Sequence, residues 1–220
     1  MAIQFQVLSF DEAERDDLRY ALRLTPAERF RRGIDLFERN ARLTRPTMRL
    51  VEDFHLNLIR LFNELNLDYI VVGGHAVNAH GYLRGSDDFD VWLANTTPNL
   101  ITFRRALKRL GVAEDDVYRL VHTLARPNDQ AVFRFRFEGY PVDFLLHLYG
   151  VTDYDTAKAR CLLVPVADTS IPFLSLEDLI TAKRATGRLK DQLDVQKLEQ
   201  IEEEKHRQRS PESGEEPANP

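Results

Sequence analysis

The chain has 220 residues, of which 43% are hydrophobic, and a formal net charge of −5 at pH 7. This length suffices for one well-packed core with an additional helical part. Every apolar stretch is shorter than the roughly 18 residues that a membrane span needs, and the N-terminus lacks the basic start and apolar centre of a signal peptide. The single cysteine, Cys161, excludes an intrachain disulfide and argues against a cysteine zinc site. We therefore expect a cytoplasmic protein that has no membrane partner and no overall attraction to nucleic acid.

The N-terminal region, residues 1–66, is expected to be a helical extension. Residues 25–28, Thr-Pro-Ala-Glu, combine an N-cap residue, a first-turn proline and a capping-box glutamate, so a helix should begin at Pro26. Its many arginines alternate with apolar residues, which predicts an amphipathic helix whose charged side meets solvent. The alternative is that this Arg-rich helix contacts an RNA or protein acceptor. A second helix is expected over residues 47–66, where apolar residues recur at intervals of three and four.

The next segment predicts a strand and a tight turn. Residues 69–72, Tyr-Ile-Val-Val, are β-branched or aromatic and are followed by Gly73 and Gly74, which indicates a buried strand and then a short helix that closes at Gly81. Unpaired N–H groups point out of such a helix start, and two residues without side chains let an anion approach closely. The glycine pair is therefore a candidate phosphate seat. The alternative is a plain tight turn, which is the commoner explanation of an isolated Gly-Gly.

A pair of carboxylates follows. Thirteen residues separate Gly74 from segment 88–93, Asp-Phe-Asp-Val-Trp-Leu, which alternates polar and apolar before it becomes wholly apolar. This is the period of a strand that enters a core, with Asp88 and Asp90 on one face. The two carboxylates would repel each other unless a cation lay between them, and Asp is disfavoured in strands. Such conflicts are expected at functional sites. The alternative is a solvated turn before an ordinary strand.

The remaining elements follow from the same kinds of signal. Helices are expected over 97–111 and 117–124, a β-hairpin over 131–146, a short helix over 151–160, a strand over 162–166 that Pro165 breaks, a helix that starts at a capping box of Ser175 and Asp178 and stops at Gly187, and a last helix from Leu189 to beyond Ile201. The composition of residues 205–220 indicates a disordered tail.

A third carboxylate, Asp143, lies inside the apolar second arm of the predicted hairpin. A buried carboxylate without a partner is costly, so Asp143 should meet a cation or a fixed hydrogen-bond donor. One such cation is a metal ion that Asp143 shares with Asp88 and Asp90. The alternative is a structural ion pair with Arg134 or Arg136 on the first arm of the hairpin.

Together these residues resemble the nucleotidyltransferase superfamily, whose fold is shared by DNA polymerase beta, by aminoglycoside and lincosamide nucleotidyltransferases and by small toxin-type members. The family signature is an apolar residue followed by Gly-Gly or Gly-Ser, then Asp-apolar-Asp-apolar, then an apolar-Asp-apolar strand. Its counterparts here are residues 72–74, 88–91 and 142–144. The resemblance covers about residues 65 to 200, because segments 173–183 and 187–194 look like the C-terminal helical part of many small bacterial members.

The resemblance implies an α/β (α+β) fold of the nucleotidyltransferase type, with a small mixed β-sheet flanked by helices. The catalytic core would span residues 67–150, and a C-terminal strand and helices over 151–204 would pack on it. The N-terminal helical extension, residues 1–66, and the tail, residues 205–220, would lie outside this core.

The resemblance also implies roles for individual residues. Magnesium prefers carboxylate oxygens, phosphate oxygens and waters, and two metals about 3.5–4 Å apart can act on the attacking and leaving oxygens of one displacement. Asp88, Asp90 and Asp143 would be the catalytic metal ligands, with Asp143 as ligand or general base near the acceptor hydroxyl; Gly73, Gly74 and Ser86 would hold the phosphates, with Arg84 or Lys183 as neutralising cations. Alternatively, Arg84 caps a helix end, Lys183 lies on the solvated side of its helix, and His75 is an ordinary first-turn residue rather than a phosphate contact.

The activity that the resemblance implies is magnesium-dependent transfer of a nucleoside monophosphate from a nucleoside triphosphate, with ATP the expected donor, to an acceptor hydroxyl, with release of pyrophosphate. The acceptor would be a small molecule, a tRNA or a protein, and a toxin-type member would need a separate antitoxin. The Arg-rich N-terminal helix favours a macromolecular acceptor, whereas the acidic balance favours a small cationic one. Two alternatives are a nucleotide-binding module without turnover and a purely structural or interaction protein.

Overall fold

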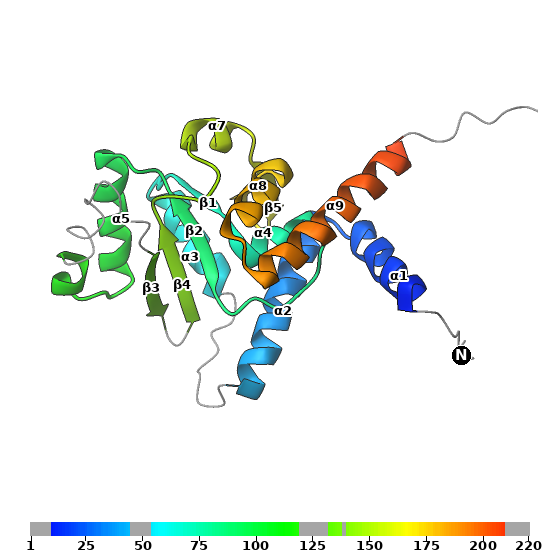
Figure 1. The fold of residues 1–220 in the computed structure, drawn as a ribbon. Helices are drawn as coiled ribbons and strands as arrows, with labels where there is room; N and C mark the ends of the chain where they lie inside the picture. Colours follow the sequence, from blue (N-terminus) through cyan, green and yellow to red (C-terminus); the bar gives the residue numbers. More distant parts are fainter. Residues whose placement is uncertain (1–9, 45–53, 119–131, 138–139, 210–220) are drawn as a thin grey trace, which may run out of the picture.

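The centre of the molecule is a six-stranded mixed β-sheet with strand order β3-β4-β2-β1-β6-β5. The computed structural model describes residues 10–44, 54–118, 132–137 and 140–209 (Figure 1). The strands are β1 (Tyr69–Val71), β2 (Phe89–Leu93), β3 (Val132–Phe137), β4 (Tyr140–Leu145), β5 (Leu162–Val166) and β6 (Thr169–Phe173). Strand β1 pairs parallel with β6, β2 pairs parallel with β4, and the other three pairings are antiparallel. The predicted α/β class with a small mixed sheet is confirmed.

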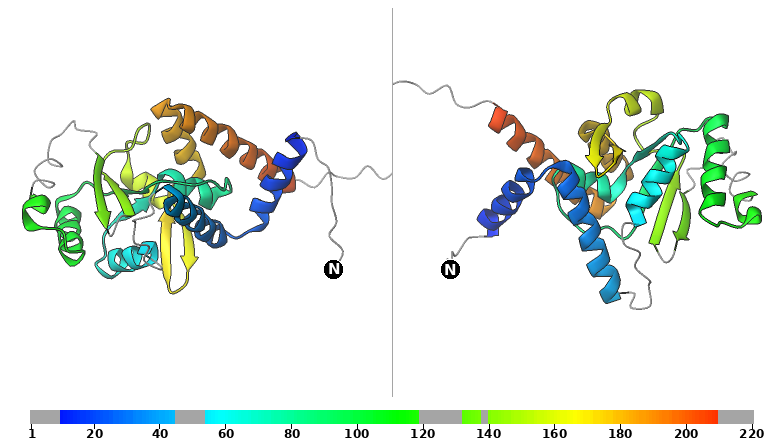
Figure 2. Two further views of the ribbon diagram at one scale, coloured as in Figure 1. Left: turned by 90° about the horizontal axis from the view of Figure 1, so that it is seen from below. Right: turned by 180° about the vertical axis from the view of Figure 1, so that it is seen from behind.

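Helices surround this sheet and extend to one side of it. They are α1 (Phe10–Arg23), α2 (Pro26–Thr44), α3 (Phe54–Glu64), α4 (Gly73–His80), α5 (Thr97–Arg109), α7 (Tyr154–Ala159), α8 (Leu176–Thr186) and α9 (Leu189–Arg209). Figures 1 and 2 show α1 beside α9, on the opposite side of the molecule from α5. Within the described ranges, each helix is too short or too polar to cross a membrane.

The two faces of the sheet differ in chemistry. The alternating side chains of β2, β3 and β4 place aromatic residues on one face, where the ring of Phe103 on α5 contacts that of Phe144 on β4. On the other face, Arg134 of β3 lies opposite Asp143 of β4, and Asp143 lies opposite Asp90 of β2. Three polar residues are therefore cross-strand neighbours on this face of the sheet. We call Arg134, Asp143 and Asp90 the polar row.

Most predicted helix boundaries agree with the structure. The Glu28 N–H donates to Thr25 Oγ1 at 3.2 Å and the Thr25 N–H donates to Glu28 Oε2 at 2.7 Å, which confirms the capping box before α2. In α8 the Ser175 side chain accepts from the Asp178 N–H as expected, and Gly187 closes the helix with φ of +66°. The predicted helices over 47–66 and 117–124 extend in part outside the described residues.

Three predictions at the C-terminal side need correction. Pro165 does not break its strand, because β5 is the edge of the sheet and Pro165 pairs with Ser170 at a position where a missing N–H is tolerated. Strand β6, which joins β5 in a hairpin, was missed because it leads directly into the α8 capping box. Helix α9 continues to Arg209, so residues 205–209 are helical, and the rest of the predicted tail lies outside the described residues.

Candidate functional site

The start of α4 is tied to strand β2 by close backbone contact. The Val72 N–H donates to the Asp90 carbonyl at 3.0 Å. Val72 is also the N-cap residue of α4, and its apolar side chain cannot cap the N–H groups of the helix start. A Cβ atom at Gly73 would lie 1.9 Å from Asp90 Oδ2, and one at Gly74 would lie 2.3 Å from Ser86 Oγ. Since the first N–H groups of a helix have no partner within it, this glycine pair leaves donors next to a carboxylate and a hydroxyl. The segment is a helix start rather than a plain turn.

Three carboxylates converge beside this helix start. One oxygen each of Asp88, Asp90 and Asp143 lies within 4.8 Å of the others, and Asp143 is 5% exposed. Burial, together with the nearby charges of Asp88 and Asp143, raises the pKa of Asp90 to about 7. Three such groups need a proton or a cation among them. The donor set consists of hard oxygen atoms and therefore fits a magnesium ion.

Arg134 binds two of these carboxylates. Its Nε and Nη2 atoms donate to Oδ1 and Oδ2 of Asp143 at 2.7 and 2.6 Å, and Nη2 also donates to Asp88 Oδ2 at 2.7 Å. The hydrogen bonds to Asp143 hold the pKa of the Arg134 guanidinium above its ordinary value. The ion pair expected as the alternative for Asp143 is therefore present, with Arg134 as the cation. Arg136 lies opposite Pro141 instead.

The predicted phosphate-neutralising cations line the same cavity but already have acidic partners. Arg84 donates from Nε and Nη2 to the two carboxylate oxygens of Asp194 at 2.6 and 2.7 Å. Lys183 Nζ lies 2.6 Å from Asp191 Oδ1 and 2.8 Å from Asp194 Oδ2. The alternative that placed Lys183 on a solvated helix side is wrong, because the residue is buried. Arg84 joins the loop before β2 to α9 and does not cap a helix end.

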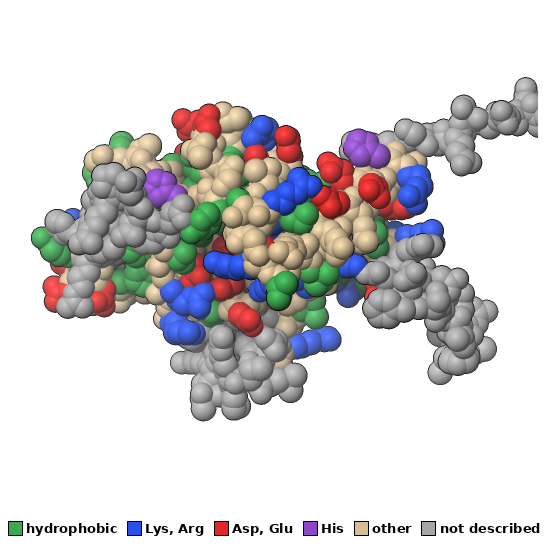
Figure 3. Space-filling view, viewed as in Figure 1, with side chains coloured by type: hydrophobic (Ala, Val, Ile, Leu, Met, Phe, Trp, Pro, Cys, Tyr) green, Lys and Arg blue, Asp and Glu red, His purple; other side chains and the backbone are tan. Residues whose placement is uncertain are grey.

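These groups surround one cavity of about 470 Å³. Its lining includes all the predicted site residues, Gly73, Gly74, Arg84, Ser86, Asp88, Asp90, Asp143 and Lys183. Figure 3 shows the molecule from the side of Figure 1, with acidic side chains near the middle of the view and Lys and Arg side chains around them. Arg188 and Lys190, which are exposed on the same lining, were not assigned from the sequence. The signal that points to them is the presence of two basic residues within three positions after the helix-ending Gly187.

His75 belongs to the core rather than to the cavity. Its ring is fully buried and packs against the rings of Phe30, His55 and Phe89. Neither ring nitrogen has a hydrogen-bond partner among the described residues. Burial holds the pKa of His75 well below its ordinary value. His75 therefore lies in the first turn of α4, as the alternative interpretation expected, but its side chain is buried in the core and does not line the cavity.

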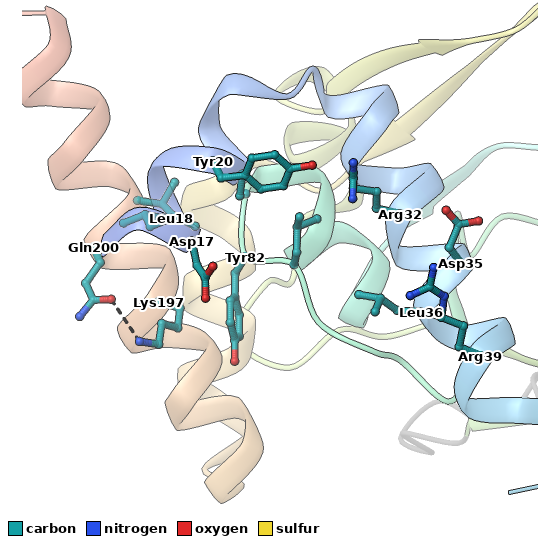
Figure 4. A pocket seen from close by; sticks show the side chains of 14 residues that line it. Asp17, Leu18, Tyr20, Arg32, Asp35, Leu36, Arg39, Tyr82, Lys197 and Gln200 are labelled. Atoms are coloured by element: carbon teal, nitrogen blue, oxygen red, sulfur yellow. Dashed lines mark hydrogen bonds between the residues drawn. The ribbon is translucent and has the colours of Figure 1, made fainter. Parts of the chain in front are cut away.

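A second cavity, of about 540 Å³, lies between α1, α2 and α9 (Figure 4). Its walls carry charged side chains such as Asp17, Arg32 and Lys197, together with apolar groups. The Arg32 guanidinium lies 5.2 Å from the centre of the Tyr20 ring. Tyr82, which also lines it, precedes Arg84 by two residues, so one loop contributes to both cavities.

Comparisons of the chain with protein-family models and with curated proteins found no match. Fold and site together define an α/β protein with a triad of aspartates beside a glycine-rich helix start.

Proposed function

We propose that the protein is a metal-dependent nucleotidyltransferase that moves a nucleoside monophosphate from a nucleoside triphosphate, ATP by preference, to an acceptor hydroxyl and releases pyrophosphate. One observation carries the proposal. The carboxylates of Asp88, Asp90 and Asp143 converge in the same cavity as the Gly73-Gly74 helix start. A metal site and an anion seat on one wall are what the transfer of a phosphoryl-linked group requires.

The proposed roles follow from position. Bound Mg²⁺ would neutralise the charge on the triphosphate and on the leaving pyrophosphate. Asp88 and Asp90 would hold it, and Asp143 would hold it or accept the proton of the acceptor hydroxyl. With its pKa raised to about 7, Asp90 populates both its neutral and its charged form near neutral pH, and a bound cation would favour the charged form.

The cavity also offers donors for the phosphates. The N–H groups at the start of α4 carry the partial positive charge of a helix N-terminus, and Ser86 Oγ lies next to Gly74. Arg84 and Lys183 both form ion pairs with Asp194. Because Asp194 neutralises part of their charge, they fix the structure of this side of the cavity more than they attract an anion. The exposed Arg188 and Lys190 would supply the attraction.

The proposal is tested by transfer of label from α-labelled nucleoside triphosphates with Mg²⁺ and with cell RNA, cell protein or small-molecule acceptors. We expect label transfer and metal-dependent nucleotide binding in wild type and loss of both in Asp90→Asn. Asp87→Asn is the matched control, because Asp87 is exposed and lies outside the cavity lining. Equal transfer by wild type and Asp90→Asn would refute the assignment of the triad.

The class of acceptor is open to the same assay. Label that enters RNA or protein, together with growth arrest on expression that Asp90→Ala relieves, would identify a toxin-type enzyme with an antitoxin partner. Label that enters an aminoglycoside or lincosamide, together with raised antibiotic tolerance, would identify a resistance-type enzyme.

A second candidate function is a nucleotide-binding module without turnover. The contacts of Arg134 with Asp88 and Asp143 favour it, because they already neutralise part of the triad. This candidate predicts metal-dependent nucleotide binding by calorimetry and no product with any acceptor over long incubations. The first candidate predicts product.

A further inference from the structure

We propose that Arg134 occupies the place of the metal in the metal-free protein, and that metal loading transfers its guanidinium from the carboxylates to the triphosphate. This inference rests on the proposed function and adds to it a residue that couples metal binding to substrate binding. Arg134 would be a positioning residue without metal and a phosphate contact with it.

The first step of the inference is competition for oxygen atoms. Arg134 takes both carboxylate oxygens of Asp143 and one oxygen of Asp88. A metal ion that binds these two carboxylates competes with these hydrogen bonds for the same oxygen atoms. Both the guanidinium and the metal are cations, so they exclude each other from the same position. Arg134 therefore lowers the metal affinity of the triad while it limits repulsion within it.

The second step is that the Arg134 side chain can move away from the carboxylates. Its side chain is 47% exposed, whereas that of Asp143 is 7% exposed. The residue lies on β3 directly opposite Asp143, so its guanidinium can swing away by rotation of side-chain bonds while the strand pairing stays in place. The buried carboxylate stays fixed and the arginine moves.

The third step is where the released guanidinium goes. The Arg134 Nη2 atom contacts Oδ2 of Asp88, and the Ser86 hydroxyl donates to Oδ1 of the same carboxylate at 3.4 Å. Ser86 in turn lies against Gly74 at the start of α4. The Asp88 carboxylate therefore lies between Arg134 and the proposed phosphate-binding helix start, and Arg134 lines the same cavity. A planar guanidinium is well suited to bind phosphate oxygens in pairs.

The test compares Arg134→Gln with Arg136→Gln, which removes the same charge from the same face of β3, opposite Pro141. Mn²⁺ binding is measured by electron paramagnetic resonance in the absence of nucleotide. We expect Arg134→Gln to bind Mn²⁺ at least about tenfold more tightly than wild type, a factor equivalent to about 1.4 kcal/mol. Arg136→Gln should stay within about twofold of wild type, as expected of an exposed charge.

Nucleotide binding should change in the opposite direction. With saturating Mg²⁺, calorimetry with a non-hydrolysable ATP analogue should show weaker binding to Arg134→Gln than to Arg136→Gln. Arg134→Lys keeps the charge but lacks the two-pronged geometry, so its metal affinity should lie between those of wild type and Arg134→Gln. This second variant also covers the case in which the glutamine variant fails to fold.

The outcomes separate the two proposals. If wild type binds Mn²⁺, Asp90→Asn does not, and Arg134→Gln matches Arg136→Gln in both titrations, the role of Arg134 is refuted and the proposed function stands. If neither wild type nor Arg134→Gln binds Mn²⁺, both proposals fail. Tighter metal binding with unchanged nucleotide binding would refute the transfer of the guanidinium to the triphosphate.

Discussion

Gly73 and Asp90 approach each other more closely than any side chain at position 73 would permit, since a Cβ atom there would lie 1.9 Å from Asp90 Oδ2. Gly73 also has φ of +62°, a left-handed conformation that residues with a Cβ adopt at a cost. The adjacent hydrogen bond from the Val72 N–H to the Asp90 carbonyl fixes the two segments together. The helix start and the carboxylate strand therefore form one rigid unit.

Gly73→Ala should disrupt this unit. The left-handed conformation alone should cost about 1–2 kcal/mol of unfolding free energy, and the clash must also displace the Asp90 carboxylate. We expect lower stability in urea denaturation and loss of Mn²⁺ binding. Gly85→Ala is the control, because, apart from its chain neighbours, no residue in the described part of the chain has an atom within 4 Å of its Cβ position. Full metal binding by Gly73→Ala would show that the contact with Asp90 is not needed by the site.

The pKa of Asp90 predicts how stability changes with pH without metal. This pKa is about 7 in the folded protein against an ordinary value of 3.8. Between these values the folded state holds a proton that the unfolded chain has released, so this contribution to stability is present at low pH and is lost as the pH rises through about 7. Asp90→Asn removes that dependence. Urea denaturation from pH 5 to 8 should show a smaller decline of the unfolding free energy between pH 5 and about 7 in Asp90→Asn than in wild type, with similar slopes above that pH.

Two conditions sharpen the measurement. Saturating Mg²⁺ should restore wild-type stability at pH 8, because it favours the ionised triad, and should do less for Asp90→Asn. The control variant Asp87→Asn should follow wild type throughout, since Asp87 is exposed. Identical pH profiles for Asp90→Asn and wild type would contradict the raised pKa.

The parts of the fold that were predictable depend on local signals. The strand 69–72, the hairpin and the capping box at Thr25 were readable because side-chain alternation and capping geometry act between near neighbours in sequence. Strand β6 was not, because its pairing with β5 and β1 is a tertiary choice and its sequence, Thr-Ser-Ile-Pro-Phe, has no clear alternation. The same holds for Pro165, whose tolerance depends on β5 being an edge strand.

The candidate site divides in a similar way. The three aspartates were recognisable because Asp90 and Asp143 are charges inside apolar strands and Asp88 directly precedes one of them, a conflict that the sequence itself displays. The partner of Arg84 was not, because Asp194 lies more than a hundred residues away and the pair exists only in the folded chain. The pairs of Lys183 with Asp191 and Asp194 depend on how α8 and α9 pack across Gly187, which the sequence does not display. The burial of His75 could not be predicted for a related reason, since its aromatic neighbours come from α2, α3 and β2. Tertiary packing determines the partners and the burial of these residues.

Asp194 should be a main determinant of stability on this wall of the cavity. It is 1% exposed and binds both Arg84 and Lys183. Removal of one partner from a buried ion pair typically costs about 3–5 kcal/mol, because the remaining charge is left without compensation. Asp194→Ala should therefore lower the free energy of unfolding by about that amount in urea denaturation.

The control for Asp194 is the exposed pair between Arg184 on α8 and Glu199 on α9. Glu199→Ala breaks an ion pair between the same two helices and should cost no more than about 1 kcal/mol, as is usual at a surface. A similar loss in Asp194→Ala and Glu199→Ala would show that the buried pairs add nothing beyond an ordinary surface contact.

His75 should limit stability in acid. Burial lowers its pKa from an ordinary 6.5, so the folded state keeps it neutral while the unfolded chain takes up a proton below that pH. Its contribution is therefore neutral above about pH 6.5 and destabilising as the pH falls, by up to about 1.4 kcal/mol per pH unit. His75→Leu should lose less unfolding free energy than wild type between pH 7 and 5. Some acid dependence should remain, because the pKa of His55 is also lowered by burial, to about 3.

The control is His206→Leu on the exposed side of α9, which should keep the wild-type slope. Urea denaturation at pH 7, 6 and 5 supplies all three slopes under identical conditions. Since neither ring nitrogen of His75 has a partner among the described residues, leucine removes no hydrogen bond there. The replacement should therefore cost little at pH 7 and gain stability relative to wild type at pH 5. Parallel pH profiles for wild type and His75→Leu would show that His75 takes up a proton in the folded state, contrary to its burial.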